Sequence, residues 1–215
     1  MASLIYKKFR CGPLRNNFYL IINTESKESI VIDAPSGSFF EYDYFTSTNP
    51  NKLKAVLITH GHWDHFAEAF RFRAAGFPIY ADVEDWEWFS STQSISFFCP
   101  AGIGIQPCQC DFFPKRDDSL SLLGETWQVI GVSGHTPGSL CFYLPSRGWL
   151  FSGDTLFRET IGRSDIPQGD PQLLLSEIRM KLLTLPEETQ VFPGHGPETT
   201  IGHEKDHNLV LNDLI

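Results

Sequence analysis

Positive charge and uninterrupted hydrophobic runs are both scarce in this chain of 215 residues. Lys and Arg together number 17 against 26 Asp and Glu, which gives a formal net charge of -9. A surface of that sign repels phosphate backbones and anionic lipids, so we expect neither nucleic acid nor a membrane as a partner. The longest uncharged stretch, residues 88–110, contains Ser, Thr, Gln, Gly and two prolines. Because those polar groups would have no partners in hydrocarbon, the stretch is not a transmembrane helix.

Cysteine is too sparse and too irregularly spaced for a disulfide framework. The five cysteines are odd in number and include no C-x-x-C pair. The apolar stretch before Lys7 and Lys8 is too short for a secretory signal, so we expect reduced thiols in a cytoplasmic, monomeric protein. Cys108 and Cys110, one residue apart, would make a poor tetrahedral metal site alone.

The apolar sequence that is present suffices for one ordinary domain. Hydrophobic residues make up 41% of the chain, and no repeat or low-complexity linker divides it, so we expect a single domain over residues 1–215. Strand-like runs come in clusters with helical patterns between and after them, which predicts an α/β fold of two sheets covered by outer helices. The uncharged segment 90–110 is expected to be a long loop that forms a lid or a binding wall. The predicted strands are 18–22, 30–34, 53–59, 77–81, 127–132, 140–144, 149–151 and 190–192, and the predicted helices are 66–74, 83–91, 171–185 and 203–214.

Three histidines and a carboxylate lie within six residues of the stretch THGHWDH, which begins at Thr59. This stretch, with the pattern HxHxDH, follows a predicted buried strand and precedes a predicted helix. Neutral imidazole and carboxylate are ligands that suit Zn, Fe and Mn. A tight loop held at the end of a strand can direct alternate side chains toward one point. The stretch therefore predicts a metal site.

Three more candidate ligands follow later strands. His135 lies in GHTPGS, Asp154 in SGDT and His195 in PGHG, and each has glycine neighbours that permit tight turns and close backbone approach. Taken singly, a histidine in a turn is more often a surface residue, and an aspartate after a strand is more often a turn former or a helix cap. Together these residues predict that several strand ends meet at one metal site.

Other polar residues carry weaker hypotheses. Asp33, in VIDAP, is a candidate carboxylate for orienting an imidazole ligand, although a plain turn at a strand end explains it equally well. His203 and His207, four residues apart on the last predicted helix, lack an accompanying carboxylate arrangement. We interpret them as surface or packing residues.

The order HxHxDH, GHTPGS, GDTLF and PGHGPETT resembles the metallo-β-lactamase superfamily, most closely its glyoxalase II (hydroxyacylglutathione hydrolase) branch. The resemblance runs from about residue 17 to residue 208, and it is strengthened by IGRSD at 161–165 and TIGHEK at 200–205. It implies an αββα four-layer sandwich, the metallo-β-lactamase fold, with the metal site at one edge of the two sheets. The chain is most similar to short bacterial members without the C-terminal helical domain.

Carried over residue by residue, the resemblance implies a site for two divalent metal ions, zinc first, with iron or manganese as alternatives. The first metal would be bound by His60, His62 and His135, the second by Asp64, His65 and His195, and Asp154 would bridge the two. The bridging Asp154 and the absence of a cysteine ligand differ from class B β-lactamases. The resemblance therefore favours another hydrolytic activity over antibiotic hydrolysis.

Two divalent cations facing about two carboxylates leave surplus positive charge, which lowers the pKa of a bridging water from about 15.7 toward about 7. We expect the resulting hydroxide, held with Asp64 and Asp154, to attack the carbonyl of a small thioester such as S-lactoylglutathione. The thiolate product leaves readily because its conjugate acid has a pKa of about 8.5. Arg163 matches a basic substrate-binding position of the family, although a salt bridge with Asp165 or Asp170 is an equal explanation for it.

Three alternatives remain for the function. A persulfide dioxygenase of the same superfamily would use one iron at His60, His135 and Asp154. A nucleic-acid phosphodiesterase usually needs an inserted domain or an RNA-binding arm, and this acidic sequence shows neither. A binding module without catalysis commonly loses ligands, whereas this set is complete.

Overall fold

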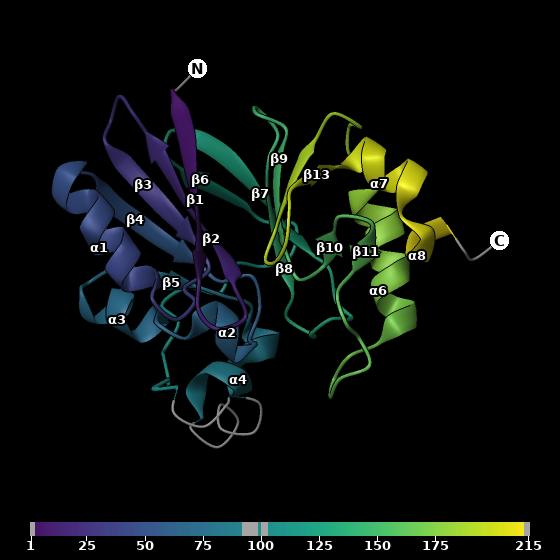
Figure 1. The fold of residues 1–215 in the computed structure, drawn as a ribbon, viewed down its shortest axis with the longest axis horizontal. Helices are drawn as coiled ribbons and strands as arrows, with labels where there is room; N and C mark the ends of the chain where they lie inside the picture. The colour runs from purple at the N-terminus through teal and green to yellow at the C-terminus, as the bar shows by residue number, and fades with distance from the viewer. Residues whose placement is uncertain (1–2, 92–98, 100–102, 213–215) are drawn as a thin grey trace.

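The computed structural model describes residues 3–91, 99 and 103–212. Two β-sheets pack face to face, and helices cover their outer sides (Figure 1). The strand order is β1-β2-β3-β4-β5 in the first sheet and β13-β12-β9-β8-β7-β6 in the second, while β10 and β11 form a separate pair. The strands are β1 (Leu4–Cys11), β2 (Asn16–Asn23), β3 (Glu28–Ile32), β4 (Lys52–Leu57), β5 (Ile79–Tyr80), β6 (Ser119–Leu122), β7 (Glu125–Gly131), β8 (Leu140–Leu144), β9 (Trp149–Gly153), β10 (Leu156–Phe157), β11 (Thr160–Ile161), β12 (Gln190–Pro193) and β13 (Thr199–Thr200).

Both sheets are mixed, and the helices fall into two sets. Strands β3, β4 and β5 pair in parallel, as do β9 and β12, whereas the other pairs are antiparallel. In Figure 1, α1 and α3 lie outside the first sheet and α6, α7 and α8 outside the second. The helices are α1 (Ser38–Thr48), α2 (Trp63–Phe66), α3 (Ala69–Ala74), the 3-10 turn η1 (Val83–Asp85), α4 (Trp86–Ser90), α6 (Pro171–Glu177), the π-helical turn η2 (Ile178–Leu182), α7 (Ile201–His207) and α8 (Leu209–Asn212).

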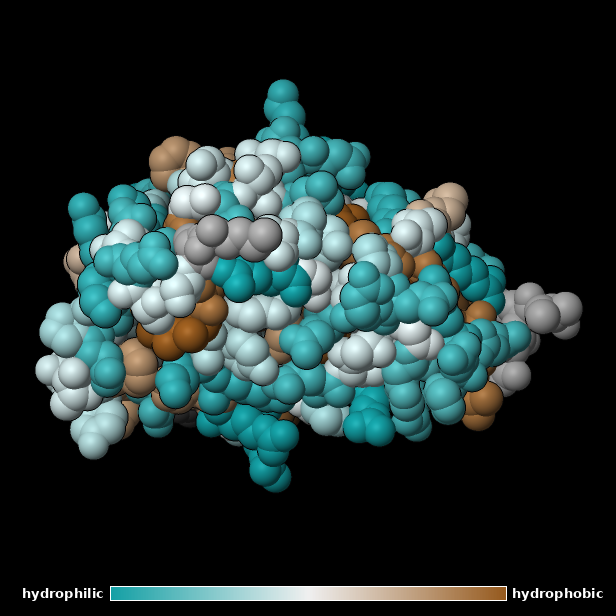
Figure 2. All heavy atoms as spheres, turned by 90° about the horizontal axis from the view of Figure 1, so that it is seen from above, coloured by the Kyte–Doolittle hydropathy of each residue, from teal (hydrophilic) through white to brown (hydrophobic). Residues whose placement is uncertain are grey.

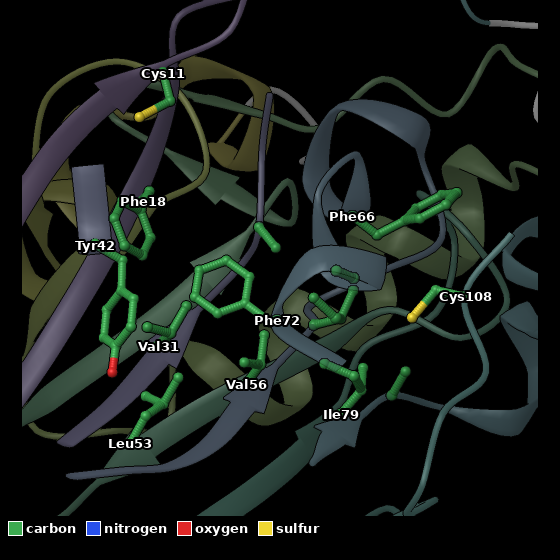
Figure 3. Packing of buried hydrophobic residues seen from close by; sticks show 14 of the residues in the cluster. Cys11, Phe18, Val31, Tyr42, Leu53, Val56, Phe66, Phe72, Ile79 and Cys108 are labelled. Atoms are coloured by element: carbon green, nitrogen blue, oxygen red, sulfur yellow. The ribbon is translucent and has the colours of Figure 1, made fainter. Parts of the chain in front are cut away.

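Strand β2 shows why the sequence forms four layers. All of its residues are buried, because its alternate side chains face two different cores. Tyr19 and Ile21 point toward the second sheet, while Phe18 packs with Tyr42 and Phe72 under the helices of the first (Figure 3). A third apolar cluster lies between the second sheet and α6 and α7. The predicted arrangement of two sheets covered by outer helices is therefore confirmed.

Several predicted elements differ in extent from the observed ones. The predicted strand 30–34 ends at Ile32, because Asp33 adopts a left-handed backbone conformation with φ 61°. The predicted helix 66–74 is divided into α2 and α3, and the predicted helix 171–185 becomes α6 followed by the π-helical turn η2. The last predicted helix starts earlier, at Ile201, because Thr200 caps it, and it is interrupted at Asn208.

The loop over residues 90–110, the cysteines and the helix lengths were also subjects of prediction. Part of the predicted loop 90–110, namely 92–98 and 100–102, lies outside the described residues, and residues 103–110 follow without helix or strand. All five cysteines have free thiols. Within the described ranges, none of the helices combines the length and apolar character needed to cross a bilayer. On the face shown in Figure 2, hydrophobic residues form separated groups among hydrophilic ones.

Candidate metal centre

All seven predicted ligands follow strands, and the structure brings them together. The strands are β4 of the first sheet and β7, β9 and β12 of the second. Three overlapping groups of candidate ligand atoms result, and in each the atoms lie within 4.8 Å of one another. Two of these groups share no residue. We call them the first group (His60, His62 and His135) and the second group (Asp64, His65 and His195), and the remaining group, His60, His65 and Asp154, links them.

The first group consists of three imidazoles from both sheets. His60 Nε2 lies 3.1 Å from His62 Nδ1 and 3.2 Å from His135 Nε2. His60 and His135 are buried and His62 is half-buried. Three ring nitrogens therefore converge on a small volume, which is the donor chemistry of a zinc, iron or manganese site.

The second group combines a carboxylate with two imidazoles. Asp64 Oδ2 lies 3.5 Å from His65 Nε2 and 3.3 Å from His195 Nε2. Burial opposes ionisation of Asp64, but the charges of His65 and His195 and a hydrogen bond from Asn16 outweigh it and lower the carboxyl pKa. The group thus offers an ionised oxygen and two ring nitrogens.

Asp154 lies between the two groups. One of its carboxylate oxygens is 3.3 Å from His65 Nε2, and the other is 3.5 Å from His195 Nε2 and 3.9 Å from His135 Nε2. Its Oδ1 is buried and has no hydrogen-bond partner among the described residues. A buried carboxylate oxygen that accepts no hydrogen bond is costly unless a cation lies beside it. Protonated His65 fills that role without metal, and a metal ion could replace that proton, so this atom fits a metal ligand.

The hydrogen bonds around the cluster determine which ring nitrogens can bind a cation. His135 Nδ1 lies 2.6 Å from the carbonyl oxygen of Arg163, and His195 Nδ1 lies 3.2 Å from that of Leu14. A carbonyl oxygen only accepts, so both Nδ1 atoms donate. In the neutral ring the Nε2 lone pair is then left free to bind a metal ion.

Asp33 orients the imidazole ligands that follow β4, His65 directly and His60 through Thr59. Its carboxylate accepts hydrogen bonds from the Thr59 backbone N–H at 2.8 Å and hydroxyl at 3.0 Å, and from His65 Nδ1 at 2.7 Å. Because the Thr59 hydroxyl donates to Asp33, its oxygen accepts from His60 Nδ1, 3.1 Å away. The Nε2 atoms of His60 and His65 are therefore both left as acceptors that face the cluster.

The histidines fall into two classes by protonation. Burial lowers the pKa of His60 well below its ordinary value and that of His62 to about 3, so both rings are neutral. Burial also opposes protonation of His65, but the carboxylates of Asp154 and Asp33 outweigh it and raise the pKa well above its ordinary value. The first group is therefore ready to bind a cation, whereas His65 must release a proton to do so.

Two glycines allow the backbone to pass close to Asp154. A Cβ atom at Gly194 would lie 2.3 Å from Asp154 Oδ1, and one at Gly162 would lie 1.8 Å from the Asp154 carbonyl oxygen. Neither contact is sterically possible, so these positions need glycine for the loops to close around the carboxylate.

The sequence analysis missed two asparagines at the start of β2. Asn16 Nδ2 lies 2.8 Å from Asp64 Oδ2, 3.2 Å from His195 Nε2 and 3.3 Å from His65 Nε2. Asn17 Nδ2 donates to the backbone carbonyl oxygens on both sides of His195, those of residues 193 and 196. Two buried amides before an apolar strand were the only available sign, and their partners lie too far away in the sequence to be inferred.

Asp85 was also missed. Its buried carboxylate accepts hydrogen bonds from Gly61 N at 2.7 Å, Thr136 Oγ1 at 2.8 Å and Gly138 N at 2.7 Å. Burial raises its pKa to about 6 despite these three donors. Asp85 lies in η1 with no distinctive neighbours in the sequence, so nothing there marked it.

A pocket of about 250 Å³ opens onto the cluster. Its apolar walls come from Leu14, Trp88, Ile166 and Pro167. Arg163 also lines it, and its guanidinium donates to Asp165 Oδ1 at 2.9 Å in an exposed ion pair. Of the two alternative salt-bridge partners for Arg163, the structure thus shows Asp165; Asp170 instead caps α6.

The remaining candidates lie apart from this cluster. His203 Nε2 is 2.9 Å from Glu159 Oε1, and the His203 ring stacks on that of His207 with centroids 4.4 Å apart. Cys108 and Cys110 pack in the apolar cluster outside the first sheet, and burial raises both thiol pKa values to about 12. None of these four residues belongs to a group of potential metal ligands among the described residues.

Comparisons with known proteins agree with this geometry. Residues 11–195 match the family model of the Metallo-beta-lactamase superfamily. The chain is 31% identical over 208 residues to the probable metallo-hydrolase YqgX of Bacillus subtilis, covering 96% of this chain and 97% of that protein. It is 38% identical over 164 residues to the hydroxyacylglutathione hydrolase GloC of Haemophilus influenzae, covering 74% of this chain and 76% of that protein.

Two solved structures are similar over nearly their whole length. The B3 metallo-beta-lactamase BLEG-1 superposes with a TM-score of 0.88 and 33% identity, covering 96% of this chain and 99% of that one. TTHA1623, in a di-iron-bound form, superposes with a TM-score of 0.81 and 33% identity, covering 94% and 98%.

Proposed function

The chain belongs to the metallo-beta-lactamase superfamily and is a metal-dependent hydrolase of that family. We propose that it uses two metal ions to hydrolyse small thioesters. The observation that carries the proposal is the convergence of His60, His62 and His135 beside Asp64, His65 and His195, with Asp154 between them.

Each group would hold one cation, and Asp154 would supply a carboxylate oxygen to both. The assignment is supported by the hydrogen bonds that direct the Nε2 atoms of His60, His65, His135 and His195 toward the cluster, and by the buried Oδ1 of Asp154, which accepts no hydrogen bond among the described residues. Zinc is the first metal to test, and the di-iron form of TTHA1623 makes iron the second.

Divalent cations bound there supply a Lewis acid and make a water molecule acidic near neutral pH. The chain's own residues supply the rest. Asp33 and the carbonyl oxygens beside the cluster hold the imidazoles in one orientation, so little reorganisation is needed when charge develops on the substrate. Asp64 and Asp154 provide anionic oxygens, and Leu14, Trp88 and Ile166 limit access of bulk water.

The substrate proposal rests on the pocket and on the similarity to GloC, which is a hydroxyacylglutathione hydrolase. A volume of about 250 Å³ lies below the roughly 300–1,000 Å³ of pockets for drug-sized ligands. We therefore assign the pocket to the acyl group and the thioester carbon, with the thiol part outside. Arg163 lies at the rim, where its guanidinium can pair with an anionic group of the substrate such as a glutathione carboxylate.

The test is metal content measured together with thioester hydrolysis. We expect about two metal ions per chain and hydrolysis of S-lactoylglutathione, followed by the loss of thioester absorbance. Asp154→Asn keeps the shape of the side chain and should abolish the activity. Two bound metals without any thioester hydrolysis would reject the substrate class, and a protein that binds no metal would reject the mechanism.

A second candidate activity, β-lactam hydrolysis, is favoured by one specific observation. BLEG-1, which superposes over nearly the whole chain, is a B3 metallo-beta-lactamase. A chromogenic cephalosporin assayed beside S-lactoylglutathione separates the two activities. A kcat/KM for the cephalosporin that exceeds the value for the thioester would make β-lactam hydrolysis the better assignment.

A further inference from the structure

A buried carboxylate outside the ligand set joins two of the loops that carry the first group. Asp85 is fully buried, and one of its oxygens accepts from Gly61 N at 2.7 Å and from Thr136 Oγ1 at 2.8 Å. The other accepts from Gly138 N at 2.7 Å. Gly61 lies between His60 and His62, and Thr136 follows His135. Asp85 therefore joins the loop after β4 of the first sheet to the loop between β7 and β8 of the second.

Asp85 packs so closely against Gly138 and Gly61 that neither position has room for a side chain. A Cβ atom at Gly138 would lie 2.6 Å from Asp85 Cγ, and one at Gly61 would lie 3.0 Å from Asp85 Cβ and 2.8 Å from Trp88 Cβ. Gly138 does not have a positive φ, so the backbone itself would accept alanine. The requirement for glycine at this position arises from the closeness of Asp85.

We propose that Asp85 is a positioning residue that sets the distance between His135 and the pair His60 and His62, and so determines the metal affinity of the first group. The inference rests on the metal assignment made under the proposed function. A single anion satisfies two backbone N–H donors and one hydroxyl, and it thereby fixes both loops at the positions that the three ring nitrogens require.

The second group is held by different residues. Asp33 orients His65, and Asn16 donates to Asp64. Among the hydrogen bonds of the described residues, Asp85 makes none to this second group or to Asp154. Loss of the Asp85 carboxylate should therefore weaken one metal site and spare the other, a selectivity that a general loss of stability would not produce.

Asp85→Asn tests this selectivity in two backgrounds. Asparagine has the same shape but only one acceptor oxygen, so its amide group faces at least one of the N–H donors. In a His195→Ala background, which disables the second group, adding Asp85→Asn should lower zinc affinity about 10–100-fold. In a His62→Ala background, which disables the first group, the affinity should change by no more than about twofold, because among the described residues Asp85 shares no hydrogen-bond partner with the second group.

The measurements are zinc titrations against a chromophoric chelator at pH 8, where the Asp85 carboxyl group is ionised. Asp82→Asn is the matched control, because Asp82 is a buried carboxylate of the same segment that caps Glu84 N and pairs with Arg116. We expect this variant to bind zinc like the parent protein. Equal losses in the two backgrounds, or no loss in either, would overturn the inference.

Two outcomes are kept separate by this design. A parent protein that binds no zinc would reject the proposed function, whereas a zinc-binding parent whose first group tolerates Asp85→Asn would reject only the positioning role. If Asp85→Asn does not fold, Gly138→Ala decides, because its methyl group would lie 2.6 Å from Asp85 Oδ1 and so displace the carboxylate. It should produce the same selective loss.

Discussion

Replacing Asp33 with Asn should weaken metal binding while leaving the fold of this protein largely intact. Asp33 is buried and has φ 61°, a left-handed conformation that asparagine adopts at little cost. Its carboxylate accepts from His65 Nδ1 and from the Thr59 backbone N–H. In Asp33→Asn the amide oxygen can still accept from Thr59, but the amide nitrogen then faces His65 and donates to it.

The expected magnitude follows from that reversal. With a donor opposite Nδ1, the neutral His65 ring carries its proton on Nε2, and the lone pair that faces Asp64 and Asp154 is lost. We expect the affinity for the second metal to fall about 10–100-fold, which corresponds to about 1.4–2.7 kcal/mol. The metal-free protein should lose only about 1–3 kcal/mol of unfolding free energy, the cost of one poorly paired buried donor.

The assay combines zinc titration with denaturant unfolding in excess chelator. Asp33→Ala serves as the comparison, because it removes every acceptor and adds about 1–2 kcal/mol of backbone strain at a positive φ. It should therefore destabilise the fold clearly more than Asp33→Asn does. If Asp33→Asn binds two zinc ions as tightly as the parent protein, Asp33 does not set the tautomer of His65 and the reasoning fails.

Three further predictions concern the loops, the rim and the pH dependence. Gly194→Ala should remove bound metal and lower thioesterase activity at least about tenfold, because its Cβ would lie 2.3 Å from Asp154 Oδ1, whereas Gly104→Ala, with nothing within 4 Å, should leave metal content and activity unchanged. Arg163→Gln should raise KM for S-lactoylglutathione several-fold with little change in kcat or melting temperature, since its ion pair is exposed; an unchanged KM would remove its substrate-binding role. Carboxylates raise the pKa of His65 above 6.5 against the effect of burial. The protonated His65 should therefore stabilise the metal-free protein fully below pH 6.5, and this stabilisation should be lost as pH rises through the folded-state pKa. A melting temperature of chelator-treated protein that rises over this range would contradict the prediction.

The sequence was informative where residue types that bind metals directly follow a predicted strand. HxHxDH and the glycine-flanked His135, Asp154 and His195 could be predicted as one site, because each follows an apolar run that forms a strand. The two-sheet arrangement could be predicted from the same runs. Asp33 was correctly identified as a candidate for orienting an imidazole, since its position after β3 places it near the end of neighbouring β4.

Other parts depend on contacts that no local pattern encodes. Strand β1 was missed because exposed or half-exposed charged residues interrupt its apolar positions, and its pairing with β2 decides its structure. Helix α1 buries few of its residues, so its sequence lacks a clear apolar stripe. Asn16 and Asp85 have partners 48 or more and 24 or more residues away, respectively, so only the assembled fold reveals what they do.

The attachment of the His195 loop to β2 has a consequence for biosynthesis. Asn17 and Tyr19 hold the carbonyl oxygens around His195, although 174 or more residues of chain separate the two segments. A growing polypeptide therefore presents its first histidines on the ribosome long before their last companion has been translated. If the two metal ions proposed above bind, both sites can be complete only after residue 195 has been synthesised, and any ion captured earlier would bind an incomplete, weaker cluster.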